Sequence, residues 1–422
     1  MNRKRHFRAL RTEPVGERVN KDRWDIVVVG AGAAGLFAAL RAKELSPHLQ
    51  VLIVEKGPKP LRKVSISGGG RCNVTHACHD LDRLLTSYPR GGHRLEAIFG
   101  RFMPQNTIDW FQERGVKLKT ESDGRMFPVT DSSQTVIDCL LGQAHKLGVS
   151  LETKVRVENI EPCGSNFHLQ AGSRKIIASK LLLATGGASK ATSWLKSLGH
   201  EVVADIPSLF TFCCNDPLLQ GLQGLSVDPV GLTLKTEPEY EASGPFLITH
   251  WGVSGPAVLR LSAFAARTLF ENNYRASLII DFLPDISESE LRLQMEGLVS
   301  PKLVQTTSPF PTIPKRLWRE LVTRGGVKKN QSWQSLKPPH IEKLVITLKQ
   351  LQVELDGKGV FKEEFVTAGG LPLHEVDVYT MESRRVPGLY VAGELLNVDG
   401  ITGGFNFQNA WATGFIAGEA MA

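Results

Sequence analysis

The chain has 422 residues, of which 42% are hydrophobic and 22% are charged. This length suggests two or three globular domains, and the composition excludes a chain that is mainly disordered. Fifty Lys and Arg against 43 Asp and Glu give a formal net charge of +7, and eight of the basic residues lie within residues 1–23. We therefore expect a basic, disordered extension on a nearly neutral body and no nucleic-acid partner. No apolar run approaches the roughly 20 residues that a membrane-spanning helix needs.

The six cysteines contain no C-x-x-C pair, which is typical of a reducing compartment. We expect a cytoplasmic protein, or a plastid protein if the basic N-terminus is the remnant of a targeting segment. Cys72, His76, Cys78 and His79 lie close together in the sequence. A structural zinc site needs a second pair of ligands, and none follows, so no metal is expected.

A β-α-β unit is predicted over residues 24–55. An apolar, β-branched strand over 24–29 leads into Gly30-x-Gly32-x-x-Gly35, a helix to about residue 45, and a second strand over 51–55. Gly30 permits a tight turn, Gly32 lets the backbone approach a pyrophosphate, and Gly35 allows close packing of helix and strand. Glu55 ends the second strand, where a carboxylate accepts hydrogen bonds from ribose hydroxyls.

Further elements follow in chain order. A glycine-rich loop is expected over 63–75, helices near 104–114 and 132–147, short strands near 116–120 and 125–128, and strands with turns over 149–184. Alternation over 231–236 and 277–282 predicts antiparallel strands, whereas 285–352 mixes helical patterns and prolines with Trp318 and Trp333, which look exposed. Glycine-rich segments that carry motifs occur again after residue 359 and continue to the C-terminus. The predicted organisation is an extension (1–23), a split cofactor domain (24–207 and 358–422) and an inserted domain (208–357).

Three further segments favour FAD over NAD. Residues 63–73 contain three successive glycines that expose backbone amides, followed by the fixed charge of Arg71. A strand ending in Gly393 and Glu394 places this carboxylate near a ribityl chain, and the glycine-rich turn 400–406 leads into a helix from about Phe407. That turn is expected to face the flavin pyrimidine edge, while residues 185–187 lie near the adenine end.

The segments 63–75, 124–128, 249–257, 366–370 and 393–408 together resemble one family. This is the FAD-dependent oxidoreductase family that includes aminoacetone oxidases and bile-acid 3-dehydro-Δ4 reductases, and the resemblance covers roughly residues 24–420. It implies an α/β fold, with a Rossmann-type FAD-binding domain and an inserted β-barrel plus helical domain. The FAD is expected to be non-covalent, and its expected contacts are Gly30, Gly32, Ala33, Ala34, Gly35, Glu55, Lys56, Lys63, Ser67, Gly69, Arg71, Cys72, Asn73, Val157, Thr185, Gly186, Gly393, Glu394, Gly403, Gly404, Phe405 and Asn406.

The expected activity is reduction of a small unsaturated or carbonyl substrate, with NAD(P)H as a transient electron donor. No second G-x-G-x-x-G motif occurs between residues 190 and 390, so a separate nicotinamide domain is not expected. Two alternatives stay open: an amine oxidase that uses molecular oxygen, and a non-catalytic flavin-binding protein. His250 and Arg71 are the candidate catalytic residues, because hydride transfer leaves a charge that a positioned donor neutralises. The competing interpretation of His250 is a core histidine at the domain hinge.

Overall fold

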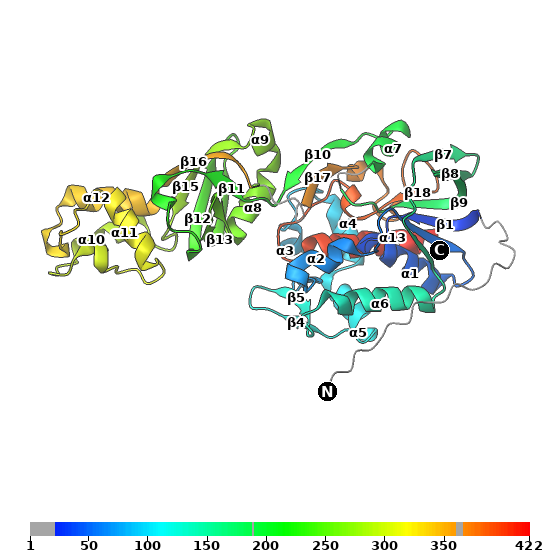
Figure 1. The fold of residues 1–422 in the computed structure, drawn as a ribbon, viewed down its shortest axis with the longest axis horizontal. Helices are drawn as coiled ribbons and strands as arrows, with labels where there is room; N and C mark the ends of the chain where they lie inside the picture. The colour runs from blue at the N-terminus through cyan, green and yellow to red at the C-terminus, as the bar shows by residue number, and fades with distance from the viewer. Residues whose placement is uncertain (1–21, 188–189, 360–365) are drawn as a thin grey trace.

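The computed structural model describes residues 22–187, 190–359 and 366–422. These residues form two lobes, one built on a large sheet and one on a barrel with helices beyond it (Figure 1). The basic extension that the sequence predicts falls almost entirely on residues 1–21, which lie outside the described residues.

The large lobe is built on a seven-stranded sheet. In spatial order its strands are β6 (Ser150–Thr153), β2 (Val51–Glu55), β1 (Arg23–Val29), β9 (Arg174–Leu183), β8 (Asn166–Ala171) and β7 (Asn159–Cys163), and β18 (Leu389–Val391) also pairs with β9. The pairs among β6, β2, β1, β9 and β18 are parallel, whereas β7, β8 and β9 are antiparallel. The apolar run that predicted the first strand is buried on both faces, as a central parallel strand requires.

Helices pack against this sheet. Helix α1 (Ala33–Leu45) and the C-terminal helix α13 (Phe405–Met421) lie against each other, because Gly414 and Gly418 have no side chain to separate α13 from Ala34 and Ala38. Three other helices are α2 (Arg62–Gly70), α6 (Ser133–Lys146) and α7 (Ala191–Ser197). In Figure 1, α1, α2, α6 and α13 lie together on one side of the sheet.

The segment between α2 and α6 forms a small subdomain. It contains a three-stranded sheet in the order β3 (Thr75–His76), β5 (Arg125–Pro128) and β4 (Leu118–Thr120). Its helices are α3 (Leu81–Leu85), α4 (Arg94–Arg101) and α5 (Pro104–Glu113). The predicted helices near 104–114 and 132–147 and the predicted short strands near 116–120 and 125–128 are confirmed within about two residues.

The small lobe contains a closed six-stranded barrel. Its order is β11 (Phe212–Cys214), β14 (Gly252–Ser254), β13 (Tyr240–Ile248), β12 (Ser226–Lys235), β15 (Arg275–Asp281) and β16 (Leu351–Lys358). Helices α8 (Pro256–Phe264) and α9 (Ala266–Glu271) follow β14, and α10 (Glu288–Glu296), α11 (Lys315–Arg324) and α12 (Pro338–Lys349) form the far end of the lobe (Figure 1). The predicted Rossmann-type domain, interrupted by a barrel plus helices, is therefore confirmed.

Two antiparallel strands connect the lobes: β10 (Val203–Ser208) enters the insert and β17 (Val366–Gly370) leaves it. A buried charge cluster lies beside them. The Arg90 guanidinium binds both carboxylate oxygens of Asp399, and its Nη2 also donates to the carbonyl oxygen of Ala263 at 2.8 Å. Asp399 also accepts a hydrogen bond from the Ser208 hydroxyl at 2.7 Å. Asp399 is fully buried, so this cluster fixes α8 of the insert to the cofactor domain.

Two expectations about local structure were wrong. Residues 63–75 are not a plain loop, because helix α2 begins at Arg62 and ends in left-handed glycines. Trp318 and Trp333 are buried, at 1% and 4% exposure, where α11 packs in the core of the insert. The indole N–H of each donates to a backbone carbonyl, from Trp318 to Val304 and from Trp333 to Thr307. Their polar neighbours in the sequence concealed this burial.

Candidate functional site

The start of α1 contains an open cradle at Gly32. A Cβ at Gly30 would lie 2.4 Å from the Ala184 carbonyl oxygen, and a Cβ at Gly35 would lie 2.1 Å from that of Gly30. At Gly32, by contrast, nothing lies within 4 Å of such an atom. Gly32 is the N-cap of α1, and no side chain caps the first N–H groups of this helix. An uncapped helix N-terminus behind open space is suited to a pyrophosphate.

Glu55 lies at the end of β2, beside this cradle. Its carboxylate accepts hydrogen bonds from the N–H groups of Ala31 at 3.0 Å and Gly57 at 2.7 Å. The N–H of Val155 donates to the Glu55 carbonyl at 2.9 Å, which places the buried Val157 close to the same strand end. Lys56 is exposed. A carboxylate has about four lone-pair positions, so Glu55 retains acceptors for ribose hydroxyls while it orders the glycine turn.

The second cofactor segment folds as a bent helix end. Ser67 leaves the helical conformation, and Gly68 and Gly69 take positive φ angles of +57° and +67°. Nothing lies within 4 Å of a Cβ placed at Gly69 or Gly70, so the backbone there is accessible to a ligand. Glycine adopts this backbone without steric cost.

The three residues after these glycines, 71–73, are fixed by contacts within the protein. Arg71 pairs with Glu121 at 2.6 Å, and its guanidinium lies 3.9 Å from the centre of the Phe127 ring. Cys72 is fully buried, and burial raises the pKa of its thiol to about 12. The side-chain oxygen Oδ1 of Asn73 accepts a hydrogen bond from the Met126 N–H at 3.3 Å. The roles of these residues toward the cofactor stay predictions.

Glu394 joins four segments that the sequence singled out separately. Its carboxylate forms an ion pair with Lys63 and accepts from the Thr367 N–H at 3.0 Å. A Cβ on Gly186 would lie 3.7 Å from a Glu394 oxygen, and one on Gly393 would lie 2.9 Å from Ala34. The structure therefore brings Lys63, Gly186 and Glu394 together along the cradle. The contact with Thr367 was missed: the segment 366–370 belongs to the family resemblance, but none of its residues was among the expected FAD contacts.

The C-terminal turn ends in a second uncapped helix. Helix α13 begins at Phe405, two residues before the predicted start, and its N-cap Gly404 has a φ of +95°. Asn406 closes the turn through two hydrogen bonds to the Gly400 backbone, both at 2.9 Å. A Cβ on Gly404 would lie 2.6 Å from the Thr75 carbonyl. Gly404 is thus required for packing within the protein, whereas the sequence predicted only a contact with FAD.

A cavity of about 430 Å³ lies between the lobes, and we call it the junction cavity. His76, Arg83, Gly403 and Phe405 line it from the cofactor domain, and Pro256 and Arg260 line it from α8. The His76 ring stacks on Phe405 with 4.7 Å between ring centres. The cavity therefore borders the turn expected at the flavin edge. Its arginines were missed, although Arg260 follows the motif at 249–257 by only a few residues.

The two candidate catalytic residues do not line this cavity. His250 lies in the turn between β13 and β14 and is exposed, so the interpretation as a core histidine was wrong. Arg71 is held by Glu121 and, at 3.6 Å, by Asp131. Among the described residues, ligand-type atoms converge at Glu201, His374 and Glu375, but Arg385 already binds the carboxylate of Glu375 at 2.6 Å.

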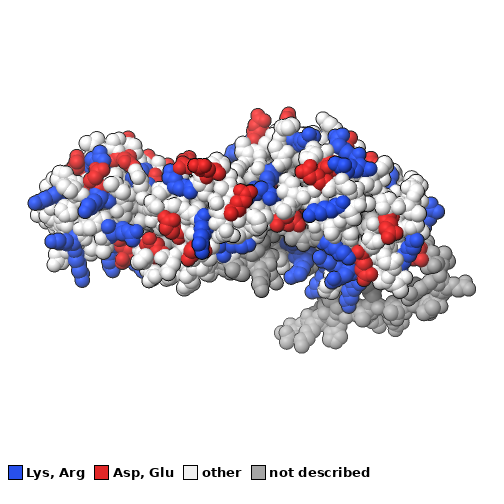
Figure 2. Space-filling model, turned by 90° about the horizontal axis from the view of Figure 1, so that it is seen from above, with Lys and Arg blue, Asp and Glu red and all other residues white. Residues whose placement is uncertain are grey.

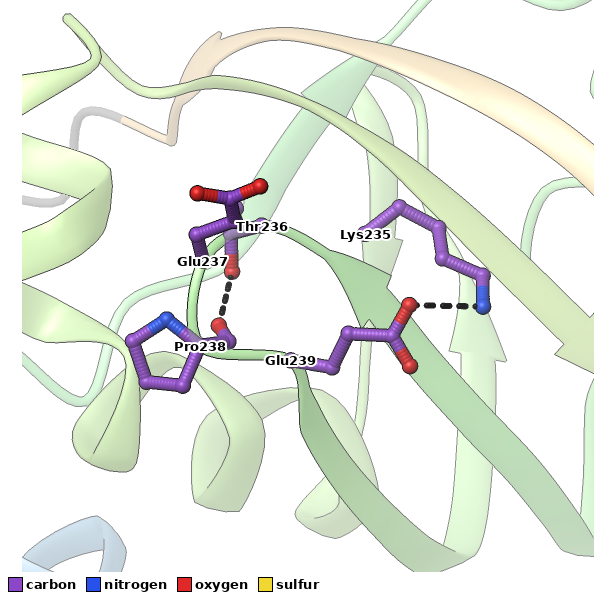
Figure 3. A pocket seen from close by; sticks show the side chains of 5 residues that line it. All are labelled: Lys235, Thr236, Glu237, Pro238 and Glu239. Carbon is purple, nitrogen blue, oxygen red and sulfur yellow. Dashed lines mark hydrogen bonds and ion pairs between the residues drawn. The ribbon is translucent and has the colours of Figure 1, made fainter.

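A larger cavity of about 530 Å³ lies at the turn between β12 and β13 (Figure 3). Five consecutive residues, 235–239, line it. Lys235 and Glu239 pair with each other at 2.8 Å, and the Thr236 hydroxyl donates to the Pro238 carbonyl at 2.7 Å. Its one cation is already paired with Glu239 and none of the predicted cofactor-binding residues lines it, so the junction cavity is the better candidate.

Comparisons with known proteins agree with this geometry. The family model of the HI0933-like protein Rossmann domain matches residues 24–420. A 3-dehydro-bile acid delta(4,6)-reductase from Clostridium scindens is 30% identical over 408 residues, covering 94% of this chain and 98% of that protein. A ribosomal RNA dihydrouridine synthase from Escherichia coli is 30% identical over 409 residues, covering 95% and 98%.

Among solved structures, a 3-ketosteroid-delta4-(5alpha)-dehydrogenase from Rhodococcus jostii in complex with 4-androstene-3,17-dione matches with a TM-score of 0.51 and 16% identity. The match covers 94% of this chain and 97% of that one. At this identity the likeness shows the fold alone. Within the described ranges, no helix has both the length and the apolar character needed to cross a bilayer.

Proposed function

The chain belongs to the HI0933-like Rossmann family of FAD-dependent oxidoreductases, and we propose that it reduces a carbon–carbon double bond conjugated to a carbonyl group. The position of the junction cavity carries this proposal. It borders the turn 403–406 on one side and the insert on the other, so a substrate there would lie beside the flavin edge. We further propose NAD(P)H as the electron donor and a small molecule as the substrate.

Different residues of the chain bind the cofactor and stabilise the charges that develop in this reaction. The uncapped N–H groups of α1 and Glu55 hold the pyrophosphate and ribose of a non-covalent FAD, which supplies a hydride donor when it is bound and reduced. The N-terminus of α13 stabilises negative charge at the flavin edge, by about 0.3–2 kcal/mol for a helix end. Hydrogen-bond donors that border the cavity stabilise the negative charge that develops on the carbonyl oxygen during hydride addition.

The names of two relatives support this reaction class. One is a delta(4,6)-reductase of a 3-dehydro-bile acid, and the other forms dihydrouridine, which is uridine with its ring double bond reduced. Both names describe saturation of a double bond conjugated to a carbonyl. We propose a small-molecule substrate and a cytoplasmic location. Ribosomal RNA, the substrate in the second relative's name, is therefore the competing substrate in the test.

The test begins with anaerobic protein that carries FAD. NADH or NADPH is mixed with it, and the flavin absorbance band is followed before and after addition of an α,β-unsaturated ketone, uridine or unmodified ribosomal RNA. We expect bleaching by one nicotinamide and recovery of the band on addition of the ketone. Recovery with RNA alone would overturn the small-molecule proposal.

The two alternatives give different results in the same apparatus. Bleaching by an amine, with release of peroxide when oxygen is admitted, would establish the amine oxidase instead. A flavin band that no donor bleaches would establish a non-catalytic flavin-binding protein.

A further inference from the structure

We propose that the junction cavity binds an anionic group of the substrate, a carboxylate or a phosphate, through Arg83 and Arg260. This inference rests on the proposed function, because it places the anion beside the double bond to be reduced. The two arginines come from different domains, Arg83 from α3 of the cofactor domain and Arg260 from α8 of the insert.

Neither arginine has an acidic partner in the part of the chain that the structure describes. The salt bridges of the neighbouring residues involve Arg125, which pairs with Asp123 at 2.6 Å and with Glu121 at 3.1 Å. Arg260 lies near an aromatic ring, with its guanidinium 5.9 Å from the centre of Phe264. Both side chains are therefore available to a ligand, and arginine pairs with carboxylate and phosphate in a bidentate geometry.

The charge inside the cavity favours an anion. Its lining has three arginines and one carboxylate, Asp123, so two positive charges are uncompensated. His76 adds no charge near neutral pH, because burial lowers the pKa of its imidazole. Its Nε2 lies 3.1 Å from the Asp123 carbonyl oxygen, which fits a neutral ring that donates from this nitrogen.

Positive charge is not spread over the whole face shown in Figure 2. Lys and Arg side chains are mixed with Asp and Glu over most of this face, and they gather mainly at the lower edge of the large lobe. A mixed surface of this kind produces little long-range attraction for a large polyanion. Arg83 and Arg260 are exposed, have no acidic partner among the described residues and line this cavity of about 430 Å³, which instead fits a single anionic group on a small molecule.

An anion bound by both arginines also connects the two domains. Gly403 and Phe405 line the same cavity, so the rest of such a ligand lies beside the turn at the expected flavin edge. The hydroxyl group of Ser87 is a further polar group in the lining, whereas that of Thr86 already donates to the Arg83 carbonyl at 2.8 Å. The two arginines thus select the substrate and orient it; they are positioning residues.

Binding to the oxidised, FAD-loaded protein tests the inference without turnover. The probes form two matched pairs: uridine 5′-monophosphate with uridine, and 4-oxo-2-pentenoate with its methyl ester. The change in flavin absorbance gives Kd for each probe. We expect the charged member of at least one pair to bind about tenfold more tightly or better, as one charge-assisted bidentate contact allows. The nucleotide pair reports a phosphate, and the acid–ester pair reports a carboxylate.

The variants are Arg83→Met, Arg260→Met, and both changes together, with Arg319→Met as the matched control. Arg319 is an exposed helical arginine of the insert that lies outside the cavity. Each single change should reduce the preference for the charged probe, the double change should abolish it, and the control should retain it. The FAD content of each variant, measured from its absorbance spectrum, reports correct folding.

Three results would overturn the inference: equal binding of charged and neutral probes by the wild type, an unchanged preference in the double variant, or no binding of any probe. The proposed function fails separately. If nicotinamides do not reduce the flavin but the charged probes still bind through Arg83 and Arg260, the anion site stands and the reductase proposal falls.

Discussion

The substitution Gly32→Ala should weaken FAD binding while the protein still folds. Gly32 has φ −86° and ψ −170°, which is extended backbone that alanine also adopts, and nothing lies within 4 Å of the added Cβ. The main cost to the protein is a poorer N-cap, about 0.5–1 kcal/mol. The same methyl group occupies the space where the pyrophosphate would approach the helix N-terminus.

The expected loss of affinity follows from the contacts that the methyl group prevents. Hydrogen bonds to a charged group contribute about 1.5–3 kcal/mol each, so moving the pyrophosphate off one or two N–H groups costs about 3 kcal/mol. This is a loss of roughly a hundredfold in Kd. Titration of deflavinated protein with FAD, followed by quenching of flavin fluorescence, measures the change.

Two other glycines provide the controls. Gly142→Ala lies within α6, where nothing is within 4 Å of the added Cβ, and it should leave Kd unchanged. In Gly35→Ala the Cβ would lie 2.1 Å from the Gly30 carbonyl oxygen, so the apoprotein itself should be destabilised. Wild-type affinity in Gly32→Ala, with the apoprotein folded, would refute the placement of the pyrophosphate at this cradle.

Three further substitutions test stability. Arg90→Met leaves the fully buried Asp399 carboxylate without its cation and should cost about 3–5 kcal/mol in urea unfolding, and a loss below about 1 kcal/mol would contradict this account. Hydrogen bonding from Arg385 lowers the pKa of Glu375 to about 2, so this carboxylate contributes stability above its unfolded pKa of 4.5 that is lost as pH falls toward 2. Glu375→Gln should therefore be less stable than wild type at neutral pH, and the gap should narrow on acidification; a constant gap would refute the linkage. Trp333→Ala should lower the free energy of unfolding by about 3–5 kcal/mol, because the indole is 4% exposed; a surface-like loss of about 0.5 kcal/mol would restore the exposed interpretation.

Local sequence determined the first β-α-β unit and the cofactor class. The spacing of Gly30, Gly32 and Gly35 and the acid at Glu55 are contiguous signals, because a tight turn, a helix start and a strand end are each specified within a few residues. The same holds for the alternating strands of the insert, whose period of two follows from the pleat. These features could be predicted because neighbouring residues alone impose them.

Only the tertiary structure decided what each glycine and each cation does. The sequence assigned Gly404 to a ligand, but its Cβ position meets the Thr75 carbonyl, which comes from a strand more than 300 residues earlier. Arg71 was a catalytic candidate and is paired with Glu121, whereas Arg83 and Arg260 carried no motif and line one cavity. These neighbours come from segments that are far apart in the chain and are brought together only when the insert folds against the cofactor domain. No local sequence pattern specifies them. Burial of Trp333 follows the same rule, since the apolar surface that covers a side chain is supplied by elements far away in the sequence.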